Sequence, residues 1–456
     1  MNAVDAMNTK RFDALIVGAG PAGSSAAVLL ARAGWSVAIV EKQAFPRRKV
    51  CGECIAASNL PLLEALGVLP ATLDALAAPA LQRVAFMQGQ RCATAPLPPA
   101  ARAGHRWARA LGRESLDSLL LEQASAAGAM VLQQWSVLSV DGPPGNLRVA
   151  ALNIATGEKT TLQARLVILA NGSWEPLQSA RQAERRVRRG SDLLAFKANF
   201  VGADLDAGLL PVLAFPGGYG GMVVADQGTT TIACCIRADR LAALRARSLE
   251  DSSANSPNLS AGETVEAMLR RECAGVDAAL RPARRVGPWL GSGPIDPGIR
   301  LRTDEPFFRI GNAAGEAHPI IGEGMSMAMQ SAWLLCDRLL ATPSPRDKEG
   351  AARWQADVAR RYAADWRRHF AVRLRLAATL AHIAMRPLPA SALLAAARHL
   401  PRAVTLGARW CAKVRCAVDP AMMARLAPRQ PPRPSAARAP VTPAAAQPHR
   451  PLIETT

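Results

Sequence analysis

The sequence contains no segment suited to crossing a membrane or to secretion. Its 456 residues include no run of about eighteen uncharged apolar residues, the length that a transmembrane helix needs. The first residues, MNAVDAMNTKRF, lack the apolar stretch of a signal peptide. We therefore expect a cytoplasmic protein with reduced cysteines, and we keep peripheral contact with the inner membrane as an alternative.

Cysteine and histidine are placed too irregularly for a zinc site. The chain has nine cysteines, but only Cys51 and Cys54 have C-x-x-C spacing, and no second pair or nearby histidine pair completes a ligand set. We expect no metal centre. The pair itself has two interpretations, packing beside a ligand, which we favour, and a redox-active dithiol.

Acidic residues are scarce relative to basic ones, and aromatic residues are scarce altogether. Lys and Arg number 55 against 36 Asp and Glu, which gives a net charge of +19, and aromatic residues make up 4%. The basic segments are not interleaved with the aromatic side chains on which nucleic-acid bases stack. We expect no nucleic-acid partner and attribute most of the excess to an Arg-rich composition.

The clearest pattern is DALIVGAGPAGSSAAVLLARAGWSVAIVEK, residues 13–42. It predicts an apolar strand, a glycine turn, a helix of small residues and a second strand that ends in Glu41. Gly18, Gly20 and Gly23 follow the G-x-G-x-x-G spacing in this strand–turn–helix context, which is typical of a dinucleotide-binding site.

Each residue of this pattern has a physical task. Gly18 permits the tight turn, Gly20 lets a pyrophosphate approach the backbone, and Gly23 lets helix and strand pack closely. The N-terminus of the helix attracts phosphates through free N–H groups and its dipole. Glu41 is placed to accept hydrogen bonds from ribose hydroxyls, and its charge disfavours a 2′-phosphate.

The middle of the chain is dominated by predicted strands. Residues 81–98 have a strand pattern, residues 113–140 a helix followed by a strand, and residues 147–170 a hairpin that leads into the apolar strand 166–170. From residue 191 to 299 the strands become rich in turns. We expect a second, mostly β domain there.

A second glycine-bearing site follows in FFRIGNAAGEAHPIIGEGMSMAMQSAWLLCDRLL, residues 307–340. It predicts a strand, a turn of small residues and a Gly-Glu-Gly loop at the start of a long apolar helix. Free N–H groups at that helix N-terminus favour an electron-rich ligand edge beside residues 322–325.

Together, GAGPAG with Glu41, GRESLD with Arg113, ILANGS and GNAAGEAHPIIGEGM resemble the flavoprotein group of para-hydroxybenzoate-type monooxygenases, geranylgeranyl reductases and flavin-dependent halogenases. The resemblance covers roughly residues 12–340 and implies bound FAD. It places Arg113 beside the pyrophosphate and these residues along the ADP half: Gly18, Gly20, Pro21, Ala22, Gly23, Glu41 and Lys42. It places these residues around the flavin end: Cys51, Gly52, Gly311, Asn312, Gly322, Gly324 and Met325.

The sequence departs from the group at two positions. Asn171-Gly172 and Gly311-Asn312 stand where Asp-Gly and Gly-Asp are usual. Asn can still hydrogen-bond a ribityl hydroxyl, but it carries no charge. FAD binding is therefore expected, with a loosely held flavin as the alternative.

Candidate catalytic residues lie around the second glycine site. We name His318 as a candidate proton donor or substrate contact and Glu323 as a residue that orients the loop, while Tyr219 is a candidate cavity residue. Since a second dinucleotide-binding pattern is absent from the sequence, NADPH or NADH is expected to reach the flavin transiently.

The resemblance leads to a predicted α/β fold: a Rossmann-type FAD-binding domain, a second, mostly antiparallel β substrate domain and a helical C-terminal region. We place the FAD-binding domain at 1–190 and 301–345, with substrate-domain strands inserted at about 75–110. The substrate domain follows at 191–300, the helical region at 346–427 and a disordered tail at 428–456. The basic helices of the C-terminal region either cap the substrate domain, which we favour, or contact a membrane.

For the activity, we expect an FAD-dependent monooxygenase of a hydrophobic polyketide, aromatic or isoprenoid in secondary metabolism. A geranylgeranyl-reductase-like reduction of a carbon–carbon double bond is the alternative. Halogenation ranks lowest, because GSWEPL at 172–177 is only a superficial echo of the W-x-W-x-I-P signature of halogenases. The sequence does not indicate the oligomeric state.

Overall fold

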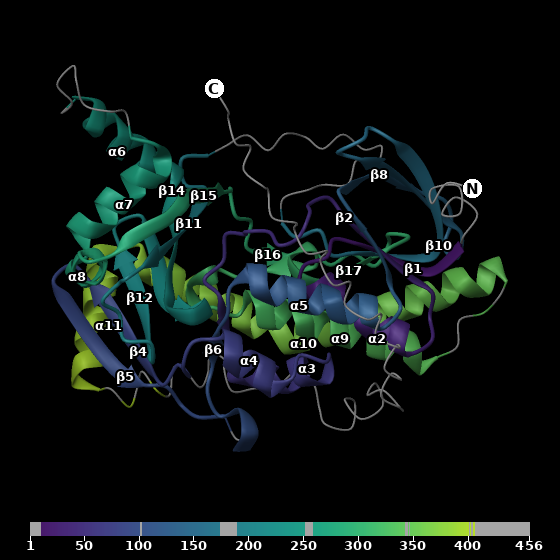
Figure 1. Ribbon diagram of the computed structural model, residues 1–456, viewed down its shortest axis with the longest axis horizontal. Helices are drawn as coiled ribbons and strands as arrows, with labels where there is room; N and C mark the ends of the chain where they lie inside the picture. Colours follow the sequence, from purple (N-terminus) through teal and green to yellow (C-terminus); the bar gives the residue numbers. More distant parts are fainter. Residues whose placement is uncertain are drawn as a thin grey trace, which may run out of the picture.

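The computed structural model describes residues 11–100, 103–173, 189–250, 259–342, 345, 347–400, 402 and 405. It consists of two large sheets, each covered by helices (Figure 1). The predicted tail at 428–456 and the end of the predicted helical region lie outside the described residues.

The central strands of the first sheet are parallel, as the strand–helix–strand pattern of residues 13–42 predicts. Its strands run in the order β7 (Met130–Gln133), β2 (Val37–Glu41), β1 (Arg11–Val17), β10 (Lys159–Leu169), β9 (Leu147–Asn153) and β8 (Trp135–Asp141). The first four strands are parallel, and β17 (Phe308–Arg309) adds to β10 in the same direction. The predicted hairpin is formed by β9 and β10, which pair in antiparallel fashion.

Three helices pack together on one face of this sheet: α2 (Pro21–Arg32), α5 (Arg113–Ala126) and α9 (Gly324–Ala341). Small residues of α2, among them Ala26 and Ala27, are completely buried and allow this close packing. A 37-residue helix, α10 (Lys348–Ala384), runs along α9 and buries Tyr362 and Trp366 against it.

The second sheet is almost entirely antiparallel. Its order is β15 (Arg284–Ser292), β11 (Leu193–Val201), β14 (Thr229–Arg237), β13 (Gly218–Ala225), β12 (Leu209–Phe215), β4 (Arg83–Gln88) and β5 (Arg91–Pro96). Only the pair of β12 and β4 is parallel. Helices α6 (Ala238–Glu250), α7 (Ala261–Glu272) and α8 (Ala274–Leu280) share a separate core with this sheet.

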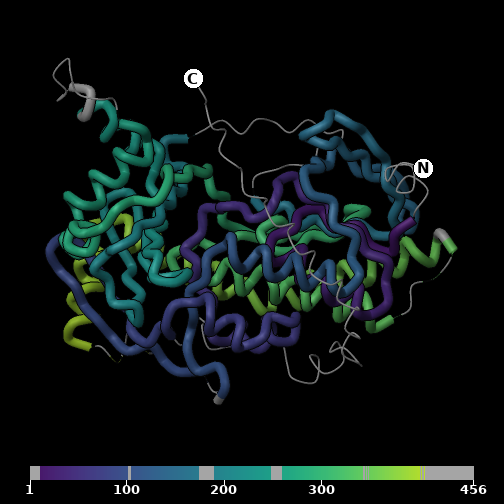
Figure 2. The backbone as a smooth tube through the Cα atoms, viewed as in Figure 1, coloured from purple at the N-terminus to yellow at the C-terminus, as the bar shows by residue number. Residues whose placement is uncertain are grey.

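The strands β4 and β5 come from a part of the chain that precedes α5, yet they complete the second sheet. The tube in Figure 2 shows these early strands beside strands that follow more than a hundred residues later. The predicted fold class is confirmed, while the predicted domain boundaries stay a prediction.

The C-terminal helices cover both layers. While α10 lies against α9, α11 (Pro387–His399) packs on β4 and β5 of the second sheet. Within the described ranges no single helix has the length and apolar composition to cross a membrane, and the one pair that meets these criteria jointly, Glu349–Ala384 with Pro387–His399, is bent by 106°.

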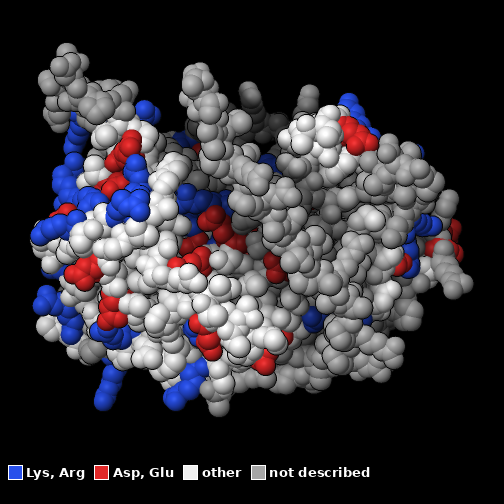
Figure 3. Space-filling view, viewed as in Figure 1, with Lys and Arg blue, Asp and Glu red and all other residues white. Residues whose placement is uncertain are grey.

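Basic side chains gather on the surface over the α6–α8 end of the molecule, at the left of Figure 3. Many of them form ion pairs with neighbouring carboxylates. Examples are Arg237 with Asp239, Arg240 with Glu272 at 2.7 Å and Arg281 with Asp277 at 2.8 Å.

Smaller elements connect these layers: β3 (Cys54–Ile55), η1 (Ala57–Asn59), α3 (Leu60–Ala65), α4 (Pro70–Leu76), η2 (Ala103–His105), β6 (Arg109–Ala110), η3 (Asp226–Gly228), β16 (Gly298–Ile299), η4 (Gly311–Ala313), β18 (Gly315–Glu316) and η5 (Pro319–Ile321).

Candidate functional site

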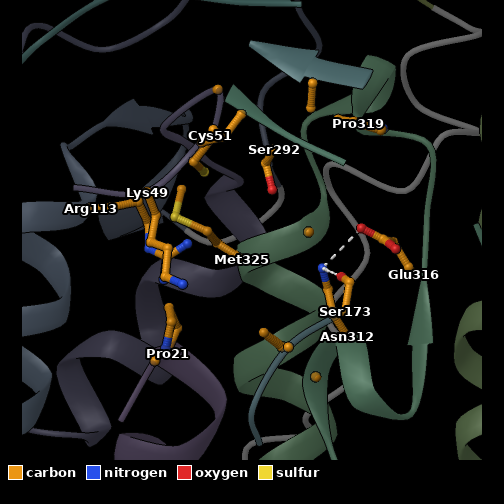
Figure 4. Close-up of a pocket in the computed structure, with 18 of the residues that line it drawn as sticks. Pro21, Lys49, Cys51, Arg113, Ser173, Ser292, Asn312, Glu316, Pro319 and Met325 are labelled. Atoms are coloured by element: carbon orange, nitrogen blue, oxygen red, sulfur yellow. Dashed lines mark hydrogen bonds between the residues drawn. The ribbon is translucent and has the colours of Figure 1, made fainter. Parts of the chain in front are cut away.

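A cavity of about 730 Å³ is lined by residues from both sheets. One end is formed by the turn between β1 and α2, and the other by strands β11–β14 of the second sheet. Between them, the loop before β3 and the start of α9 approach each other (Figure 4). Residues that are far apart in the sequence therefore share one cavity.

The turn between β1 and α2 requires glycine at two positions. Gly18 has φ +100°, and a Cβ on it would lie 2.7 Å from the carbonyl oxygen of Ala170. A Cβ on Gly23 would collide with the carbonyl oxygen of Gly18. Helix α2 begins at Pro21 immediately after Gly20, so its free N–H groups lie beside the cavity.

Two arginines converge on this turn. A Cβ built on Gly20 would lie 3.6 Å from Nη2 of Arg113 and 3.7 Å from Nη2 of Arg47. The Nε and Nη1 atoms of Arg47 are buried and have no hydrogen-bond partner among the described residues. Unsatisfied buried donors beside a helix N-terminus suit an oxyanion, so the residues present fit the pyrophosphate of a dinucleotide.

Carboxylates hold these arginines in place. Arg113 donates from Nε and Nη2 to both oxygens of Asp117 at 2.7 Å, and Nη2 of Arg47 lies 3.4 Å from the same carboxylate. Burial opposes the charge of Arg113, but its pairing with Asp117 raises the pKa of the guanidinium above its usual value. Both side chains are thus fixed as cations beside the turn.

Lys49 adds a third cationic group to the cavity wall. Burial, followed by repulsion from Arg47, lowers its pKa to about 8. Its charge at neutral pH is therefore sensitive to any anion that enters the cavity.

Strand β2 ends at Glu41, as predicted, and Glu41 lines the cavity. Its Oε2 accepts a hydrogen bond from the N–H of Ala19 and its Oε1 accepts one from the N–H of Gln43, both at 2.9 Å. The carboxylate therefore braces the glycine turn. A hydrogen bond to ribose remains a prediction, and Lys42 also lines this end of the cavity.

A polar cluster forms at the second glycine site. The Nδ2 group of Asn312 donates to Oγ of Ser173 at 3.0 Å and to Oε1 of Glu316 at 3.3 Å (Figure 4). Burial raises the pKa of Glu316, although Arg300 opposes the shift. Sequence reasoning missed Ser173 and Glu316, whose only signal was their proximity to Asn171 and Asn312 in the chain.

The Gly-Glu-Gly loop delivers the start of α9 to the cavity. Gly322 adopts the left-handed conformation, with φ +65°, and α9 begins at Gly324. Gly322, Gly324 and Met325 all line the cavity. The positive end of the α9 dipole therefore points toward a bound ligand.

The structure does not place the two candidate catalytic side chains in the wall of this cavity. Glu323 is completely buried, and its Oε2 lies 3.9 Å from Nη1 of Arg373 on α10. His318 lines a second, smaller pocket together with His382. Neighbouring positions in a tight loop point in different directions, so proximity to Gly322 in the chain was a poor guide to their orientation.

Tyr219, on β13, lines the cavity near His318. Its hydroxyl lies 3.0 Å from Nδ1 of His318. Burial, and then the neighbouring His382, lowers the pKa of His318 to about 4. His318 is therefore neutral at neutral pH, and it hydrogen-bonds Tyr219 of the cavity wall.

All predicted cofactor residues except Gly23 line the cavity, and Gly23 instead lets α2 pack closely against the turn. They are Gly18, Gly20, Pro21, Ala22, Glu41, Lys42, Cys51, Gly52, Arg113, Gly311, Asn312, Gly322, Gly324 and Met325. Cys54 lines it too, and within the described residues no disulfide joins it to Cys51. Their contact with a cofactor remains a prediction.

The end of the cavity formed by the second sheet has a mainly apolar wall. Its members are Ala195, Leu210, Pro211, Val212, Tyr219, Gly220, Gly221, Met222, Val223, Ala233, Cys234, Cys235, Ile295 and Ile320. Burial raises the pKa of the Cys235 thiol to about 12, so this group is uncharged. The wall suits an apolar molecule.

Comparison with known proteins identifies the family. The model of the FAD binding domain family matches residues 11–362, and the chain therefore belongs to this family. The resemblance seen in the sequence is confirmed, and FAD is the cofactor that this family's domain binds.

Three individual relatives share between 26% and 32% of their residues with this chain over the matched regions. The chain is 26% identical to tryptophan 2-halogenase of Chondromyces crocatus over 70% of this chain and 59% of that protein. It is 32% identical to menaquinone reductase of Mycobacterium tuberculosis over 39% and 41% of the two chains. For kynurenine 3-monooxygenase of Salinispora arenicola the identity is 26% over 74% of each chain. The chain thus spans about half the length of the first two relatives.

Solved structures share the fold. A triple mutant of the flavin-dependent brominase Bmp2 matches with a TM-score of 0.68 and 16% identity, over 91% of this chain and 98% of that chain. A geranylgeranyl bacteriochlorophyll reductase-like protein from Thermoplasma acidophilum matches with a TM-score of 0.61 and 18% identity, over 88% and 99%.

Proposed function

We propose that this protein is an FAD-dependent oxidoreductase and that it is an NAD(P)H-driven monooxygenase of a hydrophobic small molecule in secondary metabolism. The observation that carries the proposal is the shape and chemistry of one cavity. Its cationic, glycine-lined end fits a pyrophosphate, and its apolar end fits an uncharged substrate of the polyketide, aromatic or isoprenoid class.

The residues of the chain would divide the work of holding FAD. Arg47, Arg113 and the start of α2 would bind the pyrophosphate, and Asn312 would hydrogen-bond the ribityl chain. When bound, FAD supplies the electron-transfer chemistry. The N-terminus of α9 would stabilise negative charge beside Met325, and the sheet wall would exclude water from the substrate.

The reductant is proposed to be NADH or NADPH that binds transiently. The glycine-rich segment GGYGG, residues 217–221, belongs to the β12–β13 hairpin, and GSGP, residues 291–294, spans the end of β15. Neither opens a helix as a dinucleotide-binding turn does. A nicotinamide cofactor therefore has to reach the flavin through the same cavity or its mouth.

The relatives support more than one reaction. Kynurenine 3-monooxygenase, which this chain matches over 74% of both lengths, favours oxygenation. Menaquinone reductase, at 32% identity, favours the alternative, a geranylgeranyl-reductase-like reduction of a carbon–carbon double bond. Halogenation ranks third despite the halogenase relatives, because the W-x-W-x-I-P signature is absent from the sequence. The segment that partly resembles this signature is GSWEPL, and its residues 174–177 lie outside the described residues.

Peripheral membrane contact through the C-terminal helices is also a proposal. Val372 on α10 is 59% exposed and lies between the exposed Arg368 and Arg375, and Leu388 on α11 is 83% exposed and follows the exposed Arg386. Such a surface would attract an anionic bilayer. A sedimentation assay with lipid vesicles tests this contact. The protein should pellet with vesicles that contain anionic lipid and stay in the supernatant with neutral vesicles.

One experiment separates the two principal reactions. The purified protein is loaded with FAD, its visible spectrum is recorded, and NADH and NADPH oxidation is followed with and without oxygen. Oxygen-dependent oxidation that an aromatic or polyketide compound stimulates supports monooxygenation. Reduction of an isoprenoid double bond under anaerobic conditions supports the alternative, and folded protein that binds no FAD overturns both.

A further inference from the structure

The N-terminus of α5, which carries Arg113 into the cavity, is held by two carboxylates from outside that helix. Oδ1 of Asp226 accepts from the N–H of Gly112 at 2.8 Å, and Oε1 of Glu53 accepts from the N–H of Arg113 at 3.1 Å. Gly112 is the N-cap residue and has no side chain of its own to supply a cap. A Cβ on it would collide with Asp226, so glycine permits this external cap.

Glu53 has an unusual backbone for a residue other than glycine. Its φ is +56°, and its carbonyl oxygen accepts from the N–H of Leu111 at 3.0 Å. A left-handed conformation is unfavourable for a residue other than glycine, and it persists only where contacts with the surrounding structure enforce it. Here the surroundings include a carboxylate that is almost completely buried, with 2% of Glu53 exposed.

The carboxylate of Glu53 is anchored in the second sheet. It forms a buried ion pair with Nζ of Lys197 on β11, and its Oε2 accepts from Oγ1 of Thr231 on β14 at 2.5 Å. Lys197 is 1% exposed and is absent from the residues that line the cavity. Its ammonium group therefore influences the cavity indirectly, by holding the carboxylate of Glu53 in place.

These contacts connect the wall of the second sheet to the cofactor end of the cavity. Glu53 lies between Gly52 and Cys54, which line the cavity, and it holds the N–H of Arg113. Asp226, the first residue of η3 directly after β13, holds the N–H of Gly112. We propose that Lys197 and Asp226 are positioning residues, through which the second sheet fixes Arg113 and the loop 51–54 in the conformation that binds FAD.

The proposal rests on the proposed FAD site, and its consequences are specific to charge. A Lys197→Met change leaves the Glu53 carboxylate buried without its cation, which displaces it from the α5 N-terminus. A Glu53→Gln change in the same background removes the unpaired charge and keeps an oxygen acceptor. Neutralising both partners should therefore restore much of what the single change loses.

The test measures FAD dissociation constants by quenching of flavin fluorescence, together with the visible spectrum of the bound flavin. Lys197→Met should weaken FAD binding at least ~10-fold and shift the flavin spectrum, because an unpaired buried charge perturbs its surroundings. The double variant Glu53→Gln/Lys197→Met should return to within ~3-fold of wild type. Lys159→Met, at an exposed position of β10, is the matched control and should bind as wild type does.

Wild-type affinity in Lys197→Met, or a double variant that is as weak as the single one, overturns the proposal. If Lys197→Met does not fold, Asp226→Ala decides. A folded Asp226→Ala protein that binds FAD at least ~5-fold more weakly supports the proposal, because it loses the external cap, and unchanged binding overturns it. Wild-type protein that binds no FAD at all refutes the proposed function itself.

Discussion

The hydroxyl of Tyr219 lies 3.0 Å from Nδ1 of His318, and this hydrogen bond joins residues that line two different pockets. Tyr219 faces the large cavity, whereas His318 and His382 line the smaller pocket beyond it. Because His318 is 8% exposed and lies near a second histidine, protonation of its ring is disfavoured in the folded state. This relationship leads to a prediction about stability.

The stability of the protein should depend on pH through His318. Its folded-state pKa of about 4 lies below the usual 6.5, so the unfolded chain takes up the proton more readily. Stability is full above pH 6.5 and falls as the pH drops toward 4, by at most about 3 kcal/mol. Urea unfolding at pH 7.0 and 4.5 measures the loss.

The histidine responsible is identified by substitution. His318→Gln should reduce the difference in unfolding free energy between pH 7.0 and 4.5 by about 2 kcal/mol, because the variant has no imidazole to protonate. His399→Gln, at an exposed position on α11, should leave the difference unchanged. An equal pH dependence in wild type and His318→Gln contradicts the assignment.

The glycine turn should be essential for retention of FAD. Gly20→Val places a branched side chain beside the guanidinium groups of Arg47 and Arg113, where the pyrophosphate is proposed to bind. We expect FAD affinity to fall by at least ~100-fold, because the close approach of backbone and phosphate is lost. Equilibrium dialysis with FAD measures the change.

The control is Gly104→Ala, since a Cβ at Gly104 meets no atom within 4 Å. This variant should bind FAD as the wild type does. Retention of FAD by a folded Gly20→Val protein would show that the pyrophosphate binds elsewhere.

The local parts of the fold were predictable from the sequence. The first βαβ unit depends on the periodicity of residues 13–42 and on glycines whose neighbours are close in the chain, and the structure forms it from β1, α2 and β2. The second glycine site was found in the same way, because a strand, a turn and a helix follow one another there. Local patterns therefore located both glycine-bearing segments that line the cavity.

Contacts between distant segments were not predictable. Glu53 and Lys197 are separated by 144 residues, and no periodicity links a loop after one strand to an inward position of β11. His318 and Glu323 were chosen for their neighbours in the chain, but the direction of a side chain in a tight loop depends on backbone angles that the sequence does not display. The family match covers these residues without assigning their roles.

Arg47 should contribute to FAD affinity although it lies outside the glycine pattern. Its Nε and Nη1 atoms are buried without a partner within the described part of the chain, so a bound phosphate would satisfy them. Arg47→Met should weaken FAD binding by about 10–100-fold, since charge-assisted hydrogen bonds to phosphate contribute roughly 1.5–3 kcal/mol each. Isothermal titration with FAD measures the loss.

The matched control for Arg47 is Arg148→Met, because Arg148 is exposed on β9. It should leave FAD affinity unchanged, which excludes an effect of overall charge. Equal affinities of Arg47→Met and wild type would show that the donors of Arg47 do not meet the cofactor.

FAD affinity should also fall as the pH rises from 7 to 9, because Lys49 loses its proton. Burial, and then repulsion from Arg47, lowers the pKa of Lys49 to about 8, so the cavity loses one positive charge in this range. Binding of an anionic pyrophosphate favours the protonated amine, and linkage requires that affinity decline once the amine is neutral. For the protein without FAD, the free energy of unfolding should rise with pH, because a depressed lysine pKa makes the folded state more stable as the pH rises from 8 toward 10.5.

Substitutions of Lys49 test the assignment. Lys49→Met should bind FAD more weakly at pH 7 and its affinity should depend less on pH, whereas Lys49→Arg should keep its affinity up to pH 9. If the affinity of Lys49→Met declines with pH as much as that of the wild type, another group is responsible for the titration.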